Sequence, residues 1–416
     1  MAFSYKGSMK ILYNKSTLII GFAFLSFLLL LPPITYVASL LSSIVLMPFV
    51  LSSFIRSIKG NLINSIQLSQ LLLSVCFIYF FLCGFLVTNY YIAIKELIVI
   101  SYGLCLFFLL SVNPEYRINT QSIVCIMSLI LLFLCVYVLS SIDYSNYIIA
   151  EGDQVESKNP LGLRISFLSI FLLAIIAHEK SIKKNIKLLL FFASILGFVA
   201  ILFLESSRSF LFCLIVIFIW ISFNNLKAFI INFLLFFLPI SIYIILYGDQ
   251  VLRYFSNIAA FNLLFFKLEP YFPGINKYGI LQGGAYSRSD FTSQAYDIYL
   301  KGIGENPIFG LGPDNSRVLY EKEMGILTNS HNNFFEIALS YGFIGVTLWY
   351  AFFLTIIYSL FKYKHSKYFG ISLGILTGIF AISFISPIYR EPDIYVMIGF
   401  ILLILSRTSP NFLKDK

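Results

Sequence analysis

Two arginines in this sequence have the settings that phosphate binding needs. Arg208 lies in Glu-Ser-Ser-Arg-Ser (205–209) and Arg288 in Tyr-Ser-Arg-Ser-Asp (286–290), each at the predicted start of a helix. A guanidinium at the positive end of a helix can hold a phosphate group through two hydrogen bonds at once. The sequence therefore predicts two anion-binding arginines. An ion pair with the adjacent glutamate is the structural alternative for Arg208, and a solvated surface charge is the alternative for Arg288.

One histidine could supply acid–base chemistry beside these arginines. His331 lies in Asn-Ser-His-Asn-Asn (329–333), immediately before a long apolar stretch. We expect Asn329 or Ser330 to cap the following helix, which would leave His331 in its first turn with Asn332 beside it. The positive end of the helix dipole disfavours a protonated imidazole, so a neutral His331 could act as a general base towards a hydroxyl group. A purely structural histidine is the alternative.

Two further arginines, Arg164 and Arg390, stand at the predicted ends of apolar segments. A charge at the edge of a membrane is costly and needs a reason. Arg164 follows an Asn-Pro turn that opens a helix, so it could face the same anion. The alternative is an interfacial arginine whose tip reaches water. We expect Arg390 and Asn332 to play supporting roles at most.

The elements that must position these residues are membrane helices. Of the 416 residues, 59% are hydrophobic and only 12% are charged, which no soluble core could accommodate. Since a span needs about 20 apolar residues, the chain is predicted to be an all-α polytopic membrane protein with about twelve transmembrane helices. The predicted spans are 17–31, 34–55, 66–87, 91–112, 120–142, 161–178, 186–204, 209–223, 228–247, 334–360, 367–386 and 393–406.

A long polar loop divides the spans into two groups. The chain is expected to consist of spans one to nine (1–247), a partly helical loop (248–333) and spans ten to twelve (334–416). Lys and Arg gather in short loops on one side of the membrane, which predicts that both termini are cytoplasmic and that the long loop is extracytoplasmic. The net charge of +9 is therefore mainly a topology signal, and nucleic acid is excluded as a partner. The basic residues near the predicted cytoplasmic ends include Lys180, Lys183, Lys184, Lys187, Lys362, Lys364 and Lys367.

Several catalytic motifs are absent from the sequence. It has no Gly-rich phosphate loop ending in Lys-Ser or Lys-Thr, which argues against work driven by ATP. It has no HExxH motif and no Cys/His cluster, so neither a metal nor any other cofactor is expected. The first outer loop also lacks the carboxylate that metal-dependent membrane glycosyltransferases place there.

Taken in order, the polar motifs of the chain resemble the O-antigen ligase/polymerase family. The resemblance covers about residues 155–350, and its motifs are Lys-Asn-Pro-Leu-Gly-Leu (158–163), Ser-Ser-Arg-Ser (206–209), Ser-Arg-Ser-Asp (287–290), Asn-Pro-Ile-Phe-Gly-Leu-Gly (306–312), Ser-His-Asn-Asn-Phe-Phe-Glu (330–336) and Gly-Phe-Ile-Gly (342–345). The family often has Asn-Pro-Asn where this chain has Asn-Pro-Leu (159–161), so the resemblance assigns no clear role to that turn.

The resemblance implies a GT-C-like, metal-independent, inverting glycosyltransferase. It implies a glycan donor linked to undecaprenyl diphosphate, a glycan acceptor, and a site on the periplasmic face of the bacterial inner membrane. Arg208 and Arg288 would match the arginines that bind the diphosphate, with Arg164 as a weaker match. His331 would match the histidine that activates the acceptor hydroxyl.

Three functions follow from these expectations. The first is a polymerase that joins lipid-linked repeat units into O-antigen or capsular polysaccharide. The second is a ligase that transfers finished glycan to lipid A-core. The third is a flippase for lipid-linked oligosaccharide, although we see no internal repeat or interrupted span with midplane charges of the kind that transporters show. The sequence leaves open which sugars are joined and whether a chain-length regulator binds.

Overall fold

The fold is helical throughout the part that can be described. The computed structural model describes residues 65–85, 90–111, 120–140, 158–180, 182–204, 206–224, 288–313, 315–324, 332–384 and 386–408. Every regular element in these ranges is a helix, which confirms the all-α prediction. The spans predicted at 17–31, 34–55 and 228–247 lie outside the described residues, and so does His331.

The described helices follow the predicted spans to within three residues at each end. The first group is α3 (Ser65–Gly84), α4 (Tyr90–Ser111), α5 (Thr120–Ser140), α7 (Lys158–His178), α8 (Lys184–Phe203) and α9 (Ser207–Asn224). The second group is α15 (Asn333–Lys362), α16 (Phe369–Ser383), the short 3-10 helix η4 (Ile388–Arg390) and α17 (Pro392–Thr408).

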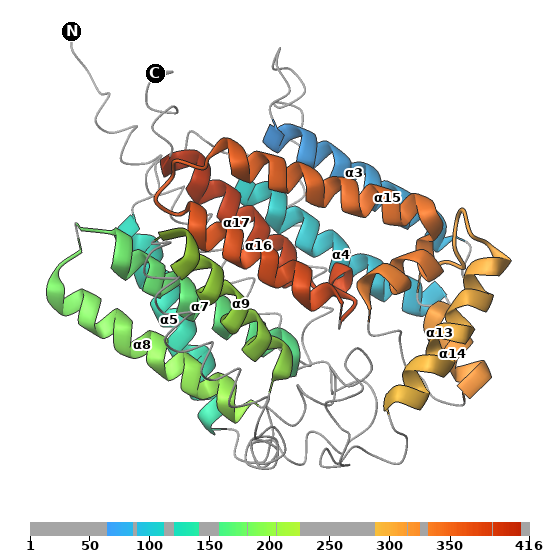
Figure 1. Cartoon of the computed structure of the whole chain (residues 1–416), viewed down its shortest axis with the longest axis horizontal. Coiled ribbons are helices and arrows are strands. Elements are labelled where there is room, and N and C mark those ends of the chain that lie inside the picture. Colours follow the sequence, from blue (N-terminus) through green and yellow to red (C-terminus); the bar gives the residue numbers. More distant parts are fainter. Residues whose placement is uncertain are drawn as a thin grey trace, which may run out of the picture.

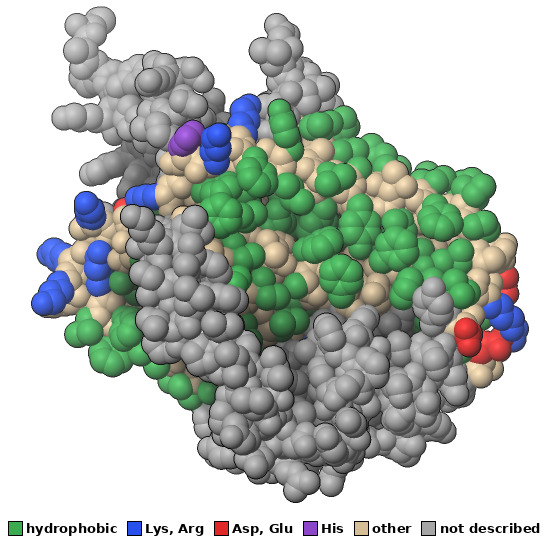
Figure 2. Space-filling view, viewed as in Figure 1, with side chains coloured by type: hydrophobic (Ala, Val, Ile, Leu, Met, Phe, Trp, Pro, Cys, Tyr) green, Lys and Arg blue, Asp and Glu red, His purple; other side chains and the backbone are tan. Residues whose placement is uncertain are grey.

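The apolar surface of the bundle is that of a membrane protein. Among the described helices, α3, α7, α8 and α15 are each long and apolar enough to cross a membrane, whereas α5, α9, α16 and α17 contain shorter apolar stretches. These residues do not test the predicted count of about twelve. Large side chains such as Leu189 and Phe192 on α8 are each 61% exposed, and green apolar side chains cover much of the described surface in Figure 2. Such a surface is stable only against lipid or another apolar partner.

The helices pack in neighbouring pairs that bring distant segments together. In Figure 1, α15 runs beside α3, α17 beside α4, and α16 beside α9. The last pair approaches closely because α16 presents Gly374 and Gly378 to α9, where an added Cβ would lie 2.8 Å from the carbonyl oxygen of Val216 or from Cδ2 of Phe212. Small residues at such positions are how membrane helices gain contact area without a hydrophobic driving force.

Helix α15 is broken near its start, at Gly342. The backbone of Gly342 has φ 64° and ψ −169°, a conformation that only glycine adopts readily. The break separates a short first segment (333–341) from the long remainder of the helix. It also frees backbone groups that would otherwise bond within the helix.

A turn from the long loop satisfies these freed groups. Residues 306–312, the Asn-Pro-Ile-Phe-Gly-Leu-Gly motif, lie against the break. The amides of Leu311 and Gly312 donate to the carbonyls of Leu339 (2.7 Å) and Ser340 (2.9 Å), and the amide of Phe343 donates to the carbonyl of Pro307 (2.9 Å). The 306–312 motif and the Gly-Phe-Ile-Gly motif (342–345) therefore form one structural unit. This unit fixes the direction in which α15 begins.

The described part of the long loop is folded against α15. It forms α13 (Arg288–Glu305) and α14 (Asn315–Met324), and both pack on the first segment of α15. The rings of Tyr299 on α13 and Phe335 on α15 lie 4.1 Å apart. The prediction of a helix starting at Arg288 and of a partly helical loop is confirmed for these residues.

Candidate functional site

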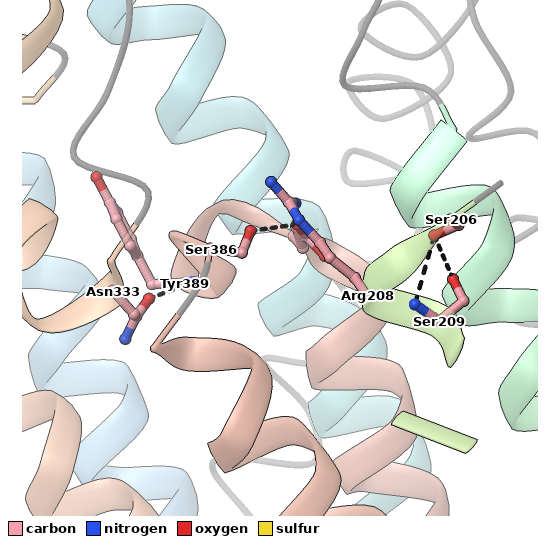
Figure 3. Close-up of polar contacts among 7 residues, drawn as sticks. Ser206, Arg208, Ser209, Asn333, Ser386 and Tyr389 are labelled. Atoms are coloured by element: carbon pink, nitrogen blue, oxygen red, sulfur yellow. Dashed lines mark hydrogen bonds and ion pairs between the residues drawn. The ribbon is translucent and has the colours of Figure 1, made fainter. Parts of the chain in front are cut away.

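Arg208 belongs to a cluster of arginines at one end of the bundle. It is the second residue of α9, and the hydroxyl of Ser206 accepts a hydrogen bond from the amide of Ser209 (3.4 Å), so Ser206 caps the helix. Arg208 Nη1 lies 3.2 Å from Glu391 Oε1, an ion pair across 183 residues of sequence. Figure 3 shows Arg208 extending from α9 towards Ser386, with the Ser206–Ser209 pair on the side away from Ser386. Glu205, the partner considered from sequence, lies outside the described residues.

The partner of Arg208 belongs to the short connection between α16 and α17. This connection, residues 386–391, includes η4 and is held in place by a polar contact within it and by one from α17. The Ser386 hydroxyl donates to Glu391 Oε1 (3.4 Å), and the Tyr395 hydroxyl donates to the carbonyl of Tyr389 (2.7 Å). Glu391 is thereby fixed where Arg208 can reach it.

The same connection carries a second arginine, Arg390. Its Nη2 donates to Glu336 Oε1 on α15 (2.8 Å), and its Nε donates to the hydroxyl of Tyr389 (2.7 Å). The Arg390 guanidinium also lies 5.2 Å from the centre of the Tyr389 ring, within the range of a cation–π contact. Arg390 thus ties the connection to the first turn of α15.

Arg164 is the third arginine of the cluster and the most buried. It lies in the second turn of α7, is 4% exposed, and its Nε donates to Asp393 Oδ2 at the start of α17 (2.8 Å). From the sequence, Arg164 could have been an interfacial arginine whose tip reaches water. That alternative is wrong, because the guanidinium is inside the bundle and bound to a carboxylate. Removing either charge would leave the other buried without compensation.

The first turn of α15 adjoins the cluster through two asparagines. Asn332 Oδ1 accepts hydrogen bonds from the amides of Phe334 (2.9 Å) and Phe335 (3.2 Å), so Asn332 is the N-cap. Asn332 Nδ2 donates to the carbonyl of Phe384 (3.4 Å), and Asn333 Oδ1 accepts from the amide of Tyr389 (2.9 Å), as Figure 3 shows for the second pair. The start of α15 is therefore bound to the C-terminal end of α16 and to the α16–α17 connection.

This geometry corrects the cap predicted from the sequence. Neither Asn329 nor Ser330 caps α15, because Asn332 satisfies the first free amides and the helix begins at Asn333. His331 consequently precedes the cap instead of lying in the first turn. The dipole argument for a neutral imidazole, which assumed a place inside the helix, loses its structural basis.

Arg288 is the first residue of α13, and its side chain lies outside the described residues. The direction of α13 is nevertheless defined. Tyr299 packs on Phe335, and Gly302 lies against Leu339 further along α15, so α13 and the first segment of α15 run the same way. The start of α13 therefore lies about 16 Å before Tyr299, beyond the N-terminal end of α15. This is the side on which the arginine cluster lies.

The sequence reasoning missed the three carboxylates of the cluster, Glu336, Glu391 and Asp393. A signal for them was present. Charges are rare in this chain, and Arg-Glu-Pro-Asp (390–393) interrupts its apolar C-terminal part. Buried arginines need counterions, so acids near the ends of other spans were the natural partners.

The arrangement has the chemistry of an exchangeable anion site. Arg164 and Arg208 contact the four-residue stretch 390–393, and Arg390 belongs to it. Each of the three arginines is paired with a carboxylate. The side chains of Arg208 and Arg390 are 11% and 14% exposed, whereas that of Arg164 is 5% exposed. An incoming phosphate group could therefore replace a carboxylate at Arg208 or Arg390 more readily than at Arg164.

Comparison with known proteins agrees with the motifs in this region. Residues 192–350 match a family model described as O-antigen ligase. The matched range includes Arg208, α13, the 306–312 turn, and the broken start of α15. No match is found among curated proteins. The family resemblance carried by the sequence motifs is confirmed by this match over residues 192–350.

Proposed function

We propose that this protein is a polymerase that joins undecaprenyl-diphosphate-linked oligosaccharide repeat units into O-antigen or capsular polysaccharide. The proposal includes a GT-C-like fold with about twelve spans, cytoplasmic termini, and a site on the periplasmic face of the bacterial inner membrane. The observation that carries it is the convergence of Arg164, Arg208 and Arg390 on residues 390–393, beside the cap residue that directly follows His331.

Arg208 and Arg288 bind the diphosphate of the donor. When the bond between the anomeric carbon and the diphosphate breaks, negative charge develops on the leaving oxygen, and preorganised cations stabilise that charge without supplying a proton. Arg208 is the main contact because it stands at a helix start and is partly exposed. Arg288, at the start of α13, supplies a second guanidinium.

His331 activates the acceptor. A sugar hydroxyl is a poor nucleophile, so a base that takes its proton as the new bond forms accelerates the reaction. The hydroxyl oxygen attacks the anomeric carbon from the face opposite the diphosphate, the proton passes to the imidazole, and the configuration inverts. The donor is already activated, so no nucleotide, metal or other cofactor enters the mechanism. Asn332 holds the backbone that carries His331 by capping α15.

Arg164 and Arg390 have positioning roles in this proposal. Arg164 is almost fully buried and bound to Asp393, which suits the anchoring of α17 to α7 better than direct contact with a mobile lipid. Arg390 joins Glu336 to the α16–α17 connection and so holds Glu391 opposite Arg208. Glu391 then acts as the resting counterion that the diphosphate displaces.

The second candidate is a ligase that transfers glycan from undecaprenyl diphosphate to lipid A-core. The description of the matching family model, O-antigen ligase, favours it, and the leaving-group chemistry is the same. The two reactions differ only in the acceptor.

One experiment separates these candidates from each other and from a transporter. The purified full-length protein is given a lipid-linked repeat unit, with or without lipid A-core, and the glycan products are resolved by size. We expect a ladder of chains without core. Transfer that requires core would identify the ligase, and no new glycosidic bond under either condition would contradict the enzyme proposal.

A further inference from the structure

A second polar site lies at the opposite end of the bundle. A cavity of about 550 Å³ is lined by His178 at the end of α7, by residues 364–367 between α15 and α16, and by three aromatic rings. We propose that this cavity binds the phosphate group of an anionic phospholipid, with the acyl chains lying along the aromatic wall. The site is independent of the glycan chemistry proposed above.

Helix geometry separates this cavity from the arginine cluster. Helices α7 and α16 each pass from one site to the other. Arg164 lies near the start of α7 and His178 at its end, while Phe369 starts α16 and Ser386 follows its end. The 15 residues of α16 alone span about 22 Å. The cavity therefore cannot be part of the donor site.

The polar lining of the cavity is cationic. Lys364, His365 and Lys367 are exposed at its rim, and among the described residues no acidic side chain lines it. Lys367 also pairs with Glu179, which stands outside the lining. Figure 2 shows further Lys or Arg side chains and a histidine gathered at this end of the described surface. Such a site attracts an anion, and the predicted topology places it at the cytoplasmic leaflet, where anionic lipids are concentrated.

Residues that carry hydrogen-bond donors line the cavity. Ser366 and Gly370 contribute to the lining where α16 begins, and α16 has no side-chain cap. His178 Nε2 accepts a hydrogen bond from Trp220 Nε1 (3.3 Å), which leaves Nδ1 as the donor of a neutral ring. Lysine, serine and imidazole donors together suit phosphate oxygens.

The aromatic wall favours a lipid over free phosphate. Phe223, Phe361 and Phe369 line the cavity, with ring centres 5.5 Å apart for Phe223 and Phe369 and 5.6 Å apart for Phe361 and Phe369. Phe223 and Phe361 are 54% and 50% exposed, so apolar surface continues outwards from the cationic rim. Inorganic phosphate would leave this surface unused, whereas an acyl chain would cover it.

The test is lipid retention by the full-length protein, measured by native mass spectrometry in detergent. The probe is phosphatidylglycerol, compared with phosphatidylcholine of the same chain lengths and with inorganic phosphate. The test variant is Lys364→Gln/His365→Gln, which spares the Lys367–Glu179 pair. The matched control is Lys183→Gln/Lys184→Gln, which removes two exposed lysines at the start of α8, outside the cavity lining.

We expect the wild type and the control to retain phosphatidylglycerol in preference to phosphatidylcholine. The test variant should need about tenfold more phosphatidylglycerol for half occupancy. Equal retention by test and control variants would overturn the proposal, since binding would then depend on diffuse charge or on another surface. Saturation by inorganic phosphate without retention of phosphatidylglycerol would overturn it as well. A test variant that unfolds would be replaced by Lys364→Gln alone, with the same expected direction.

Discussion

At the level of single residues, the arginines of the cluster divide into two kinds. Arg164 and Asp393 are both almost inaccessible to water, with side chains 5% and 1% exposed, and their ion pair joins α7 to α17. Arg208 and Glu391 are more open, at 11% and 13%, and their contact is longer. Burial therefore separates Arg164, whose ion pair is closed to water, from Arg208, for which we propose exchange of its carboxylate partner for a ligand.

Arg208→Lys tests the exchangeable contact. Lysine keeps the charge but loses the planar fork that binds two phosphate oxygens, so we expect kcat/KM for the lipid-linked donor to fall by about 10- to 100-fold. The measurement is initial-rate kinetics on the purified protein. Arg317→Lys on α14 is the control and should retain wild-type rates. Normal turnover by Arg208→Lys would contradict diphosphate binding by its guanidinium.

Arg164→Met tests the buried pair. The substitution leaves Asp393 inside the bundle without its cation, and we expect a loss of about 3–5 kcal/mol in unfolding free energy. The double variant Arg164→Met/Asp393→Leu removes both charges and should recover most of this loss. Thermal unfolding in detergent measures both. A double variant less stable than either single variant would contradict a predominantly structural role for the pair.

The sequence predicted these arginines but not their partners. Arginine at the predicted end of an apolar segment is conspicuous in an apolar chain, so Arg164, Arg208 and Arg390 were identified from their positions alone. Glu391 pairs with a residue 183 positions away, and Asp393 with one 229 positions away. Such pairing depends on which helices are neighbours, which hydropathy does not reveal.

At the level of secondary-structure elements, the broken start of α15 organises the candidate site. The sequence predicted one continuous span from residue 334 to 360 and did not connect the 306–312 motif to it. The structure joins the two, because Gly342 interrupts the helix and the turn bonds to the freed backbone groups. The helix boundaries were predictable from apolar runs. The break was not, since it depends on a partner from another part of the chain.

Gly342→Ala tests this unit. The native φ and ψ are accessible only to glycine, and an added Cβ would collide with the carbonyl of Ile308. We expect a loss of about 2–3 kcal/mol in stability, together with reduced activity, since the direction of the first segment of α15 depends on the turn. Thermal unfolding and donor turnover measure the two effects.

The matched control for this prediction is Gly304→Ala. Gly304 lies in α13 with open space around its Cα, so alanine there should be neutral or stabilising by up to about 1 kcal/mol. Equal stability of Gly342→Ala and the wild type would show that the break is not required for the fold.

At the level of the whole molecule, the bundle carries a different kind of polar site at each end. One end holds the paired arginines, and the other holds the exposed lysines around the cavity. The cavity lies beside the place where the end of α7 meets the start of α16. At that junction Glu179 Oε1 accepts hydrogen bonds from Lys367 and from the hydroxyl of Tyr368 (2.8 Å). The same helices link the two ends. A substitution that breaks the polar contacts at either end should therefore lower the stability of the whole bundle.

The Glu179 junction predicts a pH dependence of stability. Burial alone would raise the pKa of Glu179, but the hydrogen bonds from Lys367 and Tyr368 outweigh it, so the pKa is lowered. A carboxylate with a lowered pKa in the folded state stabilises the fold above its ordinary pKa, and this contribution is lost as the pH falls through the folded value. Thermal stability should therefore decline below about pH 5, and Glu179→Gln should flatten that decline.

Glu321→Gln is the control for the predicted loss of thermal stability at low pH. Glu321 is an exposed carboxylate on α14, and its substitution should leave the wild-type pH profile unchanged. If Glu179→Gln and the wild type lost thermal stability identically at acidic pH, the contacts of Glu179 would not be the cause of that loss.

The central claim is that residues at the arginine end of the bundle transfer glycan from a lipid diphosphate, with His331 as the base. The most direct measurement is chain elongation by purified His331→Ala, given a lipid-linked repeat unit at saturating concentration, with donor binding measured in parallel. The account predicts that donor binding stays within about twofold of wild type while elongation falls by at least about 100-fold. A product ladder formed at the wild-type rate would contradict it.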